Sequence, residues 1–259
     1  MKYLADYHIH SIHSDDAFDT VDEICRHAVE KGLSEIAITD HYEPYVGDEY
    51  CRFYDQQRYK LDIDEARRKY EGKLAVRYGV ELGQPHLYPE GTRQVLENLQ
   101  YDYVIGSAHK FPDGIDMYEL DYMTFKEEDI CKLYLEQVRK LIEWNDFDCI
   151  GHLDLIKRYS AGVYSKNLSL NCQRELLEEV LKAAIQSGKG IEINTSGLRQ
   201  GPKETLPGPD ILKLYKSLGG EILTIGSDAH RARDVGKGIA EAAEIAKTAG
   251  FNYFTVFIN

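Results

Sequence analysis

Histidines and acidic residues gather in short clusters along this chain, and the first cluster is His8-x-His10, followed by the neighbouring acids Asp15 and Asp16. In an extended segment, side chains two residues apart point to the same side, so both imidazoles can reach one cation. Imidazole and carboxylate together suit zinc, iron or manganese. The cluster predicts a metal site, although a single His-x-His also occurs in ordinary half-buried strands.

The same residue types recur at the ends of later β-prone runs. The further candidates are His41, Glu81, His109, His152, Asp228 and His230. Six of the nine histidines fit this pattern, and only His13, His27 and His86 lie outside it. The carboxyl ends of parallel strands meet on one face, where the active sites of α/β barrels are assembled. The pattern therefore predicts that these side chains share one metal centre.

The elements that must position these residues alternate in type. Eight β-prone runs are predicted as strands, at 3–8, 34–39, 74–80, 103–107, 147–151, 190–193, 221–226 and 253–258. Helices are predicted between them, at 20–31, 59–70, 89–99, 126–144, 173–186, 209–217 and 235–249. The first helix has a clear start, because Thr20-x-x-Glu23 has the form of a capping box. The loop-like stretch 111–123 is a candidate lid over the substrate.

This alternation predicts an α/β fold. No glycine-rich dinucleotide fingerprint follows the first strand, so a closed or nearly closed parallel barrel is favoured over an open sheet. A chain of 259 residues with 43% hydrophobic residues can bury the core of one barrel. We therefore expect a single domain over residues 1–259.

The amino-acid composition indicates which kinds of molecule the protein can bind. The formal charge is −13, from 44 acidic and 31 basic residues, which disfavours binding to nucleic acid or to a membrane surface. No apolar run reaches membrane-spanning length, and the N-terminus leads directly into a predicted strand. The five cysteines form no C-x-x-C pair, so no disulfide framework is indicated. We expect a cytoplasmic protein that acts on a small molecule, whereas its oligomeric state is not predicted.

The order of these motifs, D-x-H-x-H, T-D-H, G-x-E, G-S-x-H, G-H-x-D and S-D-A-H, resembles the polymerase and histidinol phosphatase (PHP) superfamily of metal-dependent phosphoesterases over essentially the whole chain. The run G-H-L-D-L-I-K-R at 151–158 is similar to that of the monofunctional histidinol-phosphate phosphatases. The resemblance implies a distorted TIM-like parallel barrel of the (βα)7 type, with three divalent metals (Zn, Fe or Mn). Eight predicted strands exceed seven, so 253–258 is either an extra edge strand or a wrong prediction.

The resemblance also implies how the ligands are shared among the three metals. The first metal would take His8, His10, Glu81 and Asp228, and the second would take Glu81, His109 and His152. The third would take Asp16, His41 and His230. Glu81 would thus bridge two metals, which a carboxylate can do and an imidazole cannot. Asp15 is the alternative to Asp16, and the phosphatase form of the motif favours Asp16.

The predicted reaction is hydrolysis of L-histidinol phosphate to L-histidinol and phosphate in histidine biosynthesis. A hydroxide on the metals would attack phosphorus without a covalent phosphoenzyme. Glu81, His230 and Arg158 are the predicted catalytic residues. Arg158 and Arg199 are predicted to bind the phosphate, because a guanidinium matches two phosphate oxygens. Two other classes stay open, namely a PHP phosphoesterase acting on nucleotides or nucleic-acid ends and a non-catalytic metal-binding module.

Residues next to these candidates receive secondary assignments. Asp40 and Asp154 could accept hydrogen bonds from the imidazoles or could cap helices. Lys110 and Lys157 are expected on the surface, and His13 is expected to face water.

Overall fold

The structure is a computed structural model that describes residues 4–43, 54–161 and 168–257. Part of the tyrosine-rich stretch after the second predicted strand, including Cys51, lies outside the described residues.

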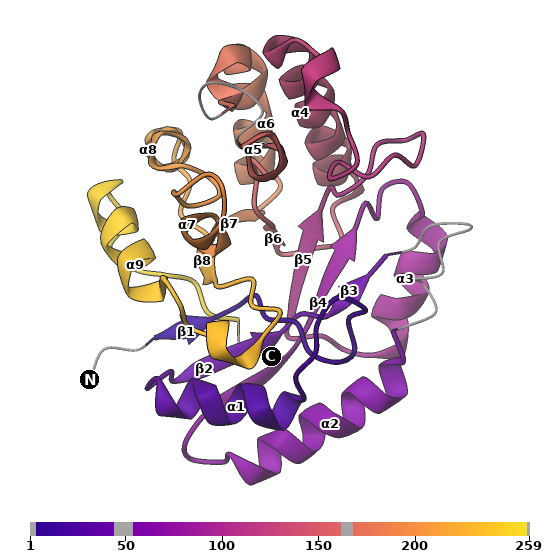
Figure 1. Ribbon diagram of the computed structural model, residues 1–259, viewed down its shortest axis with the longest axis vertical. Coiled ribbons are helices and arrows are strands. Elements are labelled where there is room, and N and C mark those ends of the chain that lie inside the picture. The colour runs from indigo at the N-terminus through magenta and orange to yellow at the C-terminus, as the bar shows by residue number, and fades with distance from the viewer. Residues whose placement is uncertain (1–3, 44–53, 162–167, 258–259) are drawn as a thin grey trace.

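A parallel sheet forms the centre of the molecule (Figure 1). Its strands are β1 (Ala5–Asp6), β2 (Glu35–Ile38), β3 (His41–Tyr42), β4 (Ala75–Gly83), β5 (Tyr103–Ser107), β6 (Cys149–Ile150), β7 (Gly190–Asn194) and β8 (Leu223–Gly226). Seven strands follow the order β1-β2-β4-β5-β6-β7-β8, and the short β3 pairs with β4.

The first and last strands of this order approach each other and nearly close the sheet. The Tyr7 backbone N–H donates to the Ile225 carbonyl over 2.9 Å, and the His10 N–H donates to the Ala229 carbonyl over 2.9 Å. Ile9 and Ala229 form a parallel bridge. The predicted α/β fold, a nearly closed TIM-like parallel barrel with seven strands in its main path, is therefore confirmed.

Helices surround the sheet on its outer side (Figure 1). They are α1 (Val21–Glu30), α2 (Gln56–Lys69), α3 (Pro89–Asn98), α4 (Glu127–Trp144), α5 (Ile156–Ser160), α6 (Arg174–Gln186), α7 (Ser196–Arg199), α8 (Pro209–Ser217) and α9 (Ile239–Thr248). Single 3-10 turns are η2 (Tyr122–Thr124), η3 (Leu170–Gln173) and η4 (Ala232–Asp234). Among the described residues, no helix combines the length and the apolar character that crossing a bilayer requires.

Local sequence signals explain where several helices begin and end. The Thr20 side chain accepts from the Glu23 backbone N–H, while the Glu23 carboxylate accepts from the Thr20 N–H, so the predicted capping box is present. Helix α4 ends at Asn145, whose left-handed backbone (φ 71°) suits an asparagine. The amphipathic faces of α1, α2, α4 and α6 bury their apolar residues against the sheet.

The interior of the barrel holds a small apolar cluster of its own. It consists of Tyr7, Ala37, Tyr103, Ile105 and Cys149, and Val256 and Phe257 pack against it. The C-terminal segment therefore covers the end of the barrel at which the strands begin. The opposite end, where the strands finish, carries the predicted metal ligands.

The strand predicted at 253–258 was wrong, and two other strands differ from the prediction in detail. Residues 253–257 form no strand, although the Thr255 N–H donates to the Leu223 carbonyl over 2.8 Å. The segment crosses beneath the barrel, and the Leu223 N–H donates in turn to Thr255 Oγ1 over 3.3 Å, so its described hydrogen bonds with β8 are confined to this one pair of residues. The strand predicted at 74–80 continues to Gly83, and His41 belongs to a strand that was not predicted, β3.

Candidate metal centre

Glu81 is the centre of the polar cluster at the carboxyl end of the barrel. Its side chain is fully buried, and five imidazoles approach its carboxylate, those of His8, His10, His41, His109 and His152. Oε2 lies 3.1 Å from His8 Nε2 and 3.1 Å from His41 Nδ1. Oε1 lies 3.0 Å from His152 Nε2 and 3.2 Å from His109 Nε2. One carboxylate thus presents each of its oxygens to a different group of imidazoles.

Strand register and unusual backbone conformations bring these side chains together. In the β3–β4 pair, His41 lies directly opposite Glu81. His152 and Asp228 both have positive φ angles, 23° and 52°, immediately after β6 and β8. Such conformations are costly for residues other than glycine and persist where the surroundings hold them, as at functional sites. His152 Nε2 then lies 3.0 Å from Glu81 Oε1, and Asp228 Oδ1 lies 3.5 Å from His10 Nε2.

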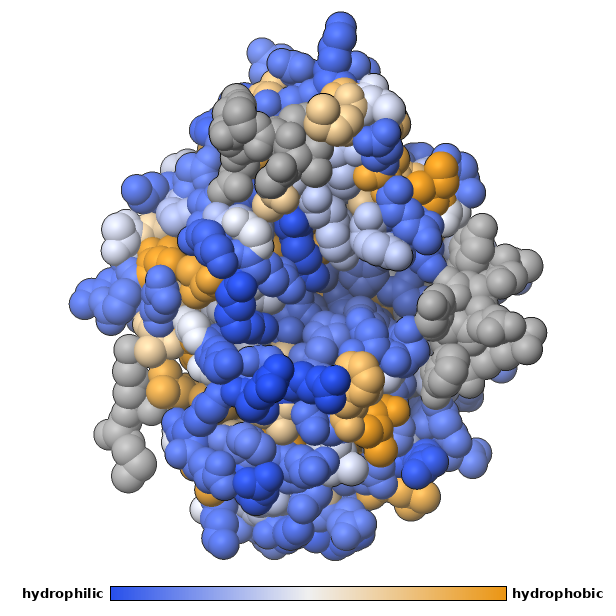
Figure 2. Space-filling view, in the orientation of Figure 1, coloured by the Kyte–Doolittle hydropathy of each residue, from blue (hydrophilic) through white to orange (hydrophobic). Residues whose placement is uncertain are grey.

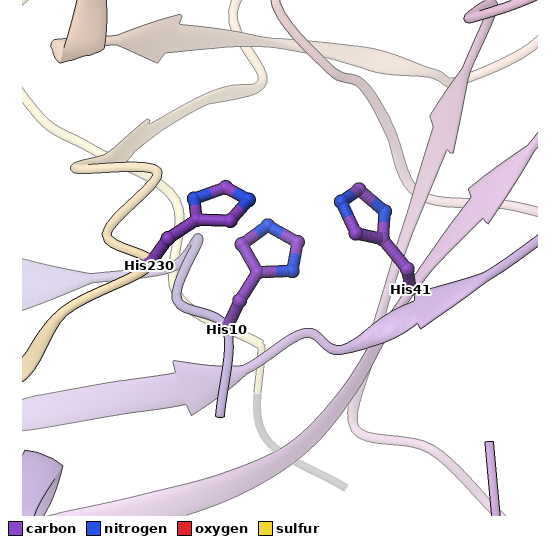
Figure 3. A group of neighbouring side chains, drawn as sticks. All are labelled: His10, His41 and His230. Atoms are coloured by element: carbon purple, nitrogen blue, oxygen red, sulfur yellow. The ribbon is translucent and has the colours of Figure 1, made fainter. Parts of the chain in front are cut away.

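A second group lies beside Glu81 and contains His10, His41 and His230 (Figure 3). The His10 ring centroid lies 4.2 Å from that of His41 and 4.2 Å from that of His230. Asp16 joins this group, because its Oδ2 is 3.0 Å from His230 Nε2 and 3.8 Å from His41 Nε2. Asp15, the alternative ligand, is exposed like Asp16, but among the described residues it has no carboxylate oxygen within 4.0 Å of an imidazole nitrogen. The geometry therefore favours Asp16.

Asp228 links the imidazoles to an arginine. Its Oδ1 lies 3.5 Å from His10 Nε2 and 3.8 Å from His8 Nε2. Arg158 Nη2 donates to its Oδ2 over 2.6 Å and to Ser196 Oγ over 2.7 Å. The structure thus brings all nine predicted ligands and Arg158 into one cluster.

The other predicted phosphate-binding residue, Arg199, has different contacts. Its Nη2 donates to the Ser227 carbonyl over 2.8 Å and, more weakly, to the Asp228 carbonyl over 3.4 Å. These bonds brace the turn that carries Asp228. Phosphate binding by Arg199 stays a prediction.

The two lysines expected on the surface are in fact buried. Lys157 Nζ lies 2.6 Å from Asp154 Oδ2 and 3.2 Å from Glu204 Oε1, and Lys110 is also largely covered. Ion pairing makes burial of Lys157 tolerable. Asp154 therefore forms an ion pair with this lysine, and none of its described contacts is with an imidazole.

Asp40 and His13 lie beneath the His8-x-His10 loop. Asp40 accepts from Ser11 and Ser14 and so fixes the loop, while the Ser14 hydroxyl is 3.2 Å from His10 Nδ1. His13 is buried and its Nε2 is 2.9 Å from Asp62 Oδ2, so the expectation that it faces water was wrong.

Charge within the cluster follows from burial and close partners. Burial alone would raise the pKa of Glu81, but His8, His41 and His109 outweigh it and hold that pKa well below the usual range. Burial, together with His41 and His230, lowers the pKa of His10 well below its usual value. Burial also disfavours ionised Asp228, yet Arg158 keeps its pKa well below the usual range. The donor set thus includes ionised carboxylates and a neutral imidazole.

These donors fit divalent cations. Ring nitrogens and carboxylate oxygens form four groups in which all ligand atoms lie within 4.8 Å of one another. His10 Nε2 is buried at the centre of the cluster and has no hydrogen-bond partner in the part of the chain that the structure describes. A buried polar atom without a partner is costly, and coordination to a cation would satisfy it.

Two contributors to the cluster were not predicted as part of the site. Glu192, in the middle of β7, lies 2.7 Å from His8 Nδ1 through its Oε1. Glu43 Oε1 lies 2.5 Å from His109 Nδ1. The signal for Glu192 was available, because a carboxylate within the apolar run Gly190–Asn194 requires a buried partner.

The cluster lies on an open and polar face. Figure 2 shows a central hollow lined by hydrophilic side chains, at the place where β4 and β5 end in Figure 1. A small charged molecule could enter the cluster from this side.

Comparisons with known proteins agree with this geometry. Residues 6–196 match the model of the PHP domain family. The chain is 30% identical to the histidinol-phosphatase of Lactococcus lactis over 99% of this chain and 95% of that protein. It is 28% identical to a probable histidinol-phosphatase of Thermotoga maritima, over 98% of this chain and 95% of that protein.

Solved structures agree as well. The crystal structure of the Lactococcus lactis histidinol phosphate phosphatase, complexed with zinc, L-histidinol and phosphate, superimposes with a TM-score of 0.89 at 28% identity. The alignment covers 98% of this chain and 96% of that chain. A putative histidinol phosphatase of Listeria monocytogenes shares the fold with a TM-score of 0.79 at 21% identity, over 92% of this chain and 99% of that chain.

Proposed function

The chain belongs to the PHP domain family, and from this premise we propose that it is a metal-dependent histidinol-phosphatase, which hydrolyses L-histidinol phosphate to L-histidinol and phosphate. The observation that carries the proposal is the convergence of five imidazoles on Glu81, with Arg158 beside them on Asp228. Similarity over the whole length to histidinol-phosphatases, including one bound to zinc, L-histidinol and phosphate, supports the choice of substrate.

Three divalent ions would be held by three sets of ligands, which the family resemblance implies and which divide the residues differently from the four geometric groups. His8, His10, Glu81 and Asp228 would hold the first, and Glu81, His109 and His152 would hold the second. Asp16, His41 and His230 would hold the third. When bound, such ions withdraw charge from phosphoryl oxygens and lower the pKa of coordinated water. Zinc, iron and manganese all suit these ligands.

Arg158 would orient the phosphate. Its Nη2 is fixed by Asp228 and Ser196, which aligns the guanidinium plane at the edge of the cluster. Its Nε is buried and has no partner among the described residues, so this N–H could donate to a phosphate oxygen. Charge-assisted hydrogen bonds of this kind fix a dianion in one orientation.

His230 has two proposed roles, that of a ligand and that of the acid that protonates the leaving alkoxide. Its side chain is 29% exposed, and its Nε2 faces Asp16 at 3.0 Å. Replacement by Gln distinguishes the roles. Loss of one of three ions supports the ligand role. Retention of all three ions, with turnover slowed only for substrates that have a poor leaving group, supports the acid role.

We also propose that the protein acts in the cytoplasm on small phosphomonoesters and not on nucleic acid. The formal charge of −13 opposes attraction of a polynucleotide backbone. Cys25, Cys131, Cys149 and Cys172 are free thiols, as is usual in a reducing compartment.

A substrate panel tests the function. Protein purified without chelators should hydrolyse histidinol phosphate far faster than bis(4-nitrophenyl) phosphate or an oligonucleotide. The Glu81→Gln variant, purified in parallel, measures activity from contaminants. A preference for the diester or the oligonucleotide would overturn the assignment of the substrate and leave the metal centre in place.

Isotope labelling tests how the phosphorus–oxygen bond breaks. The imidazoles and carboxylates around Glu81 would hold ions that lower the pKa of water, so a single turnover in labelled water should place the label in phosphate. Isolation of a phosphorylated protein intermediate would contradict direct attack by water.

A further inference from the structure

Strand β7 supplies none of the predicted metal ligands, yet two of its side chains contact three of them. Glu192 and Asn194 are two residues apart on β7, so they point to the same side of the sheet. Both are buried directly beneath the cluster. Their contacts extend to His8, His152 and Asp228, which follow three other strands.

Glu192 divides its two carboxylate oxygens between two predicted ligands. Oε1 lies 2.7 Å from His8 Nδ1, and Oε2 accepts from the His152 backbone N–H over 2.9 Å. On the other side of the His8 ring, Nε2 lies 3.1 Å from Glu81 Oε2. A proton on Nδ1, donated to Glu192, leaves Nε2 as the ring atom that can bind a cation.

The bond to His152 has a separate effect. His152 has a φ of 23°, a conformation that its surroundings must hold in place. By accepting the N–H of this residue, Glu192 holds the bend that turns His152 Nε2 toward Glu81 Oε1, 3.0 Å away. One buried carboxylate thus orients ligands of two different predicted metals.

Asn194 connects Glu192 to Asp228, and these three side chains form a buried polar layer beneath the cluster. Its Nδ2 donates to Glu192 Oε2 over 3.1 Å and to Asp228 Oδ2 over 3.2 Å, while its Oδ1 accepts from the Ser196 N–H over 3.0 Å. The layer is tightly packed, because a Cβ added at Gly226 would lie 2.2 Å from Glu192 Oε1 and 2.3 Å from His8 Cβ. Only glycine at this position allows Glu192 to reach His8.

We propose that Glu192 is a positioning residue that sets the metal affinity of the first and second sites together, through His8 and His152, and leaves the third site unaffected. The inference rests on the metal centre of the proposed function but not on the identity of the substrate. None of the described contacts of Glu192 involves Asp16, His41 or His230, the ligands predicted for the third metal.

Glu192→Gln is the test, because the side chain keeps its size and loses its charge. An amide cannot accept both bonds, since one of its two heteroatoms is a donor. The matched control is Glu35→Gln. Glu35 is equally buried, lies on β2 and bonds to Tyr7 and Arg77, which are not metal ligands.

The measurement is metal retention, and it needs no substrate. Each protein is loaded with Zn²⁺, dialysed against increasing chelator and analysed for zinc per chain. We expect Glu192→Gln to lose two of its three ions at chelator activities about 10 to 100 times lower than wild type, and to keep the third. Glu35→Gln should retain all three ions as wild type does. With Co²⁺ as the probe, the visible absorption of Glu192→Gln should change, and that of Glu35→Gln should not.

Three results would overturn the proposal: wild-type retention by Glu192→Gln, equal loss of all three ions, or the same loss in Glu35→Gln. If Glu192→Gln does not fold, Glu192→Asp replaces it. That variant keeps the charge on a shorter side chain and should show intermediate retention, whereas wild-type retention would refute the idea. Failure of histidinol phosphate turnover would leave these zinc measurements unaffected, so the two proposals can fail separately.

Discussion

The two ends of this barrel both contain buried glutamates, but their partners differ in kind. At the end where the strands begin, Glu35 accepts from the Tyr7 hydroxyl and from Arg77 Nη2, the latter over 2.9 Å. At the opposite end, Glu81 faces imidazole nitrogens that lie close to one another, with His109 Nε2 and His152 Nε2 3.5 Å apart. The first glutamate has a fixed cation and a hydroxyl as partners. The second lies among groups that can all bind a metal.

This difference separates a structural network from a functional one. Both glutamates are buried to the same degree, so burial of a charge does not by itself mark a site. Unpartnered atoms also occur at both ends, because Arg77 Nε and His10 Nε2 each lack a hydrogen bond. The distinguishing feature is the crowding of several possible ligands around one carboxylate. Four predictions test this contrast, from the largest expected effect to the smallest.

Glu81→Gln should have the largest effect. An amide is a poor bridge between two cations, so kcat/KM for histidinol phosphate should fall by at least about 10²- to 10³-fold, and bound metal should also fall. Steady-state kinetics and elemental analysis measure both quantities. Unchanged metal content and rate would remove the bridging role and, with it, the contrast with Glu35.

Removal of metal should lower the stability of the protein, and the effect should not depend on the Glu35 network at the opposite end of the barrel. Each ion that binds only the folded state at about 100 times its Kd contributes about 2.7 kcal/mol, so the loss of a single ion on chelation is equivalent to a Tm lower by about 5 to 10 °C. The same fall should be seen in Glu35→Gln, measured by thermal unfolding with and without chelator. If chelation has no effect in Glu35→Gln, the two ends are coupled and the contrast fails.

Arg158→Ala should weaken catalysis without removing metal. Loss of a charge-assisted contact of about 1.5 to 3 kcal/mol should raise KM, lower kcat and reduce kcat/KM by roughly one to two decades. Arg158→Lys should restore only part of the lost kcat/KM, because the lysine ammonium lacks the planar pair of N–H donors of a guanidinium. Unchanged kinetics for the phosphomonoester would contradict the role of Arg158 in binding phosphate.

Tyr7→Phe should have the smallest effect, and only on stability. The change removes the hydroxyl that donates to Glu35 and accepts from the Phe257 N–H over 3.0 Å. We expect unfolding to become easier by about 1 kcal/mol, measured in urea, with kcat/KM and metal content unchanged. A loss of metal in this variant would show that the amino end also controls the site.

The sequence was sufficient to predict the barrel and the nine clustered side chains, because both depend on local patterns. Alternation placed His8 and His10 on one side of an extended segment, and strand ends placed His109 and Asp228 on the same face of the barrel. These inferences require only that each strand is parallel to its neighbours.

Features that depend on partners distant in sequence could not be predicted in this way. Lys157 was expected on the surface, because its burial depends on how the assembled fold covers it together with Asp154 and on its second partner, Glu204, which lies in a distant loop. The segment at 253–257 has the composition of a strand, but it covers the barrel interior and donates to Leu223 without joining the sheet. His41 was placed after a strand, because the register that pairs it with Glu81 is a property of the assembled sheet.

The closure between β1 and β8 has a consequence for the order of events during synthesis. The Asp228 N–H donates to the His8 carbonyl over 2.8 Å. This bond cannot form until the ribosome has synthesised more than 200 further residues after His8. Chains fold from the N-terminus as they are made, and contacts so distant in sequence form late. The proposed first metal site would take ligands from both sides of this junction. A nascent chain that ends before β8 would therefore display His8 and His10 without Asp228, and full metal loading would mark a completed chain.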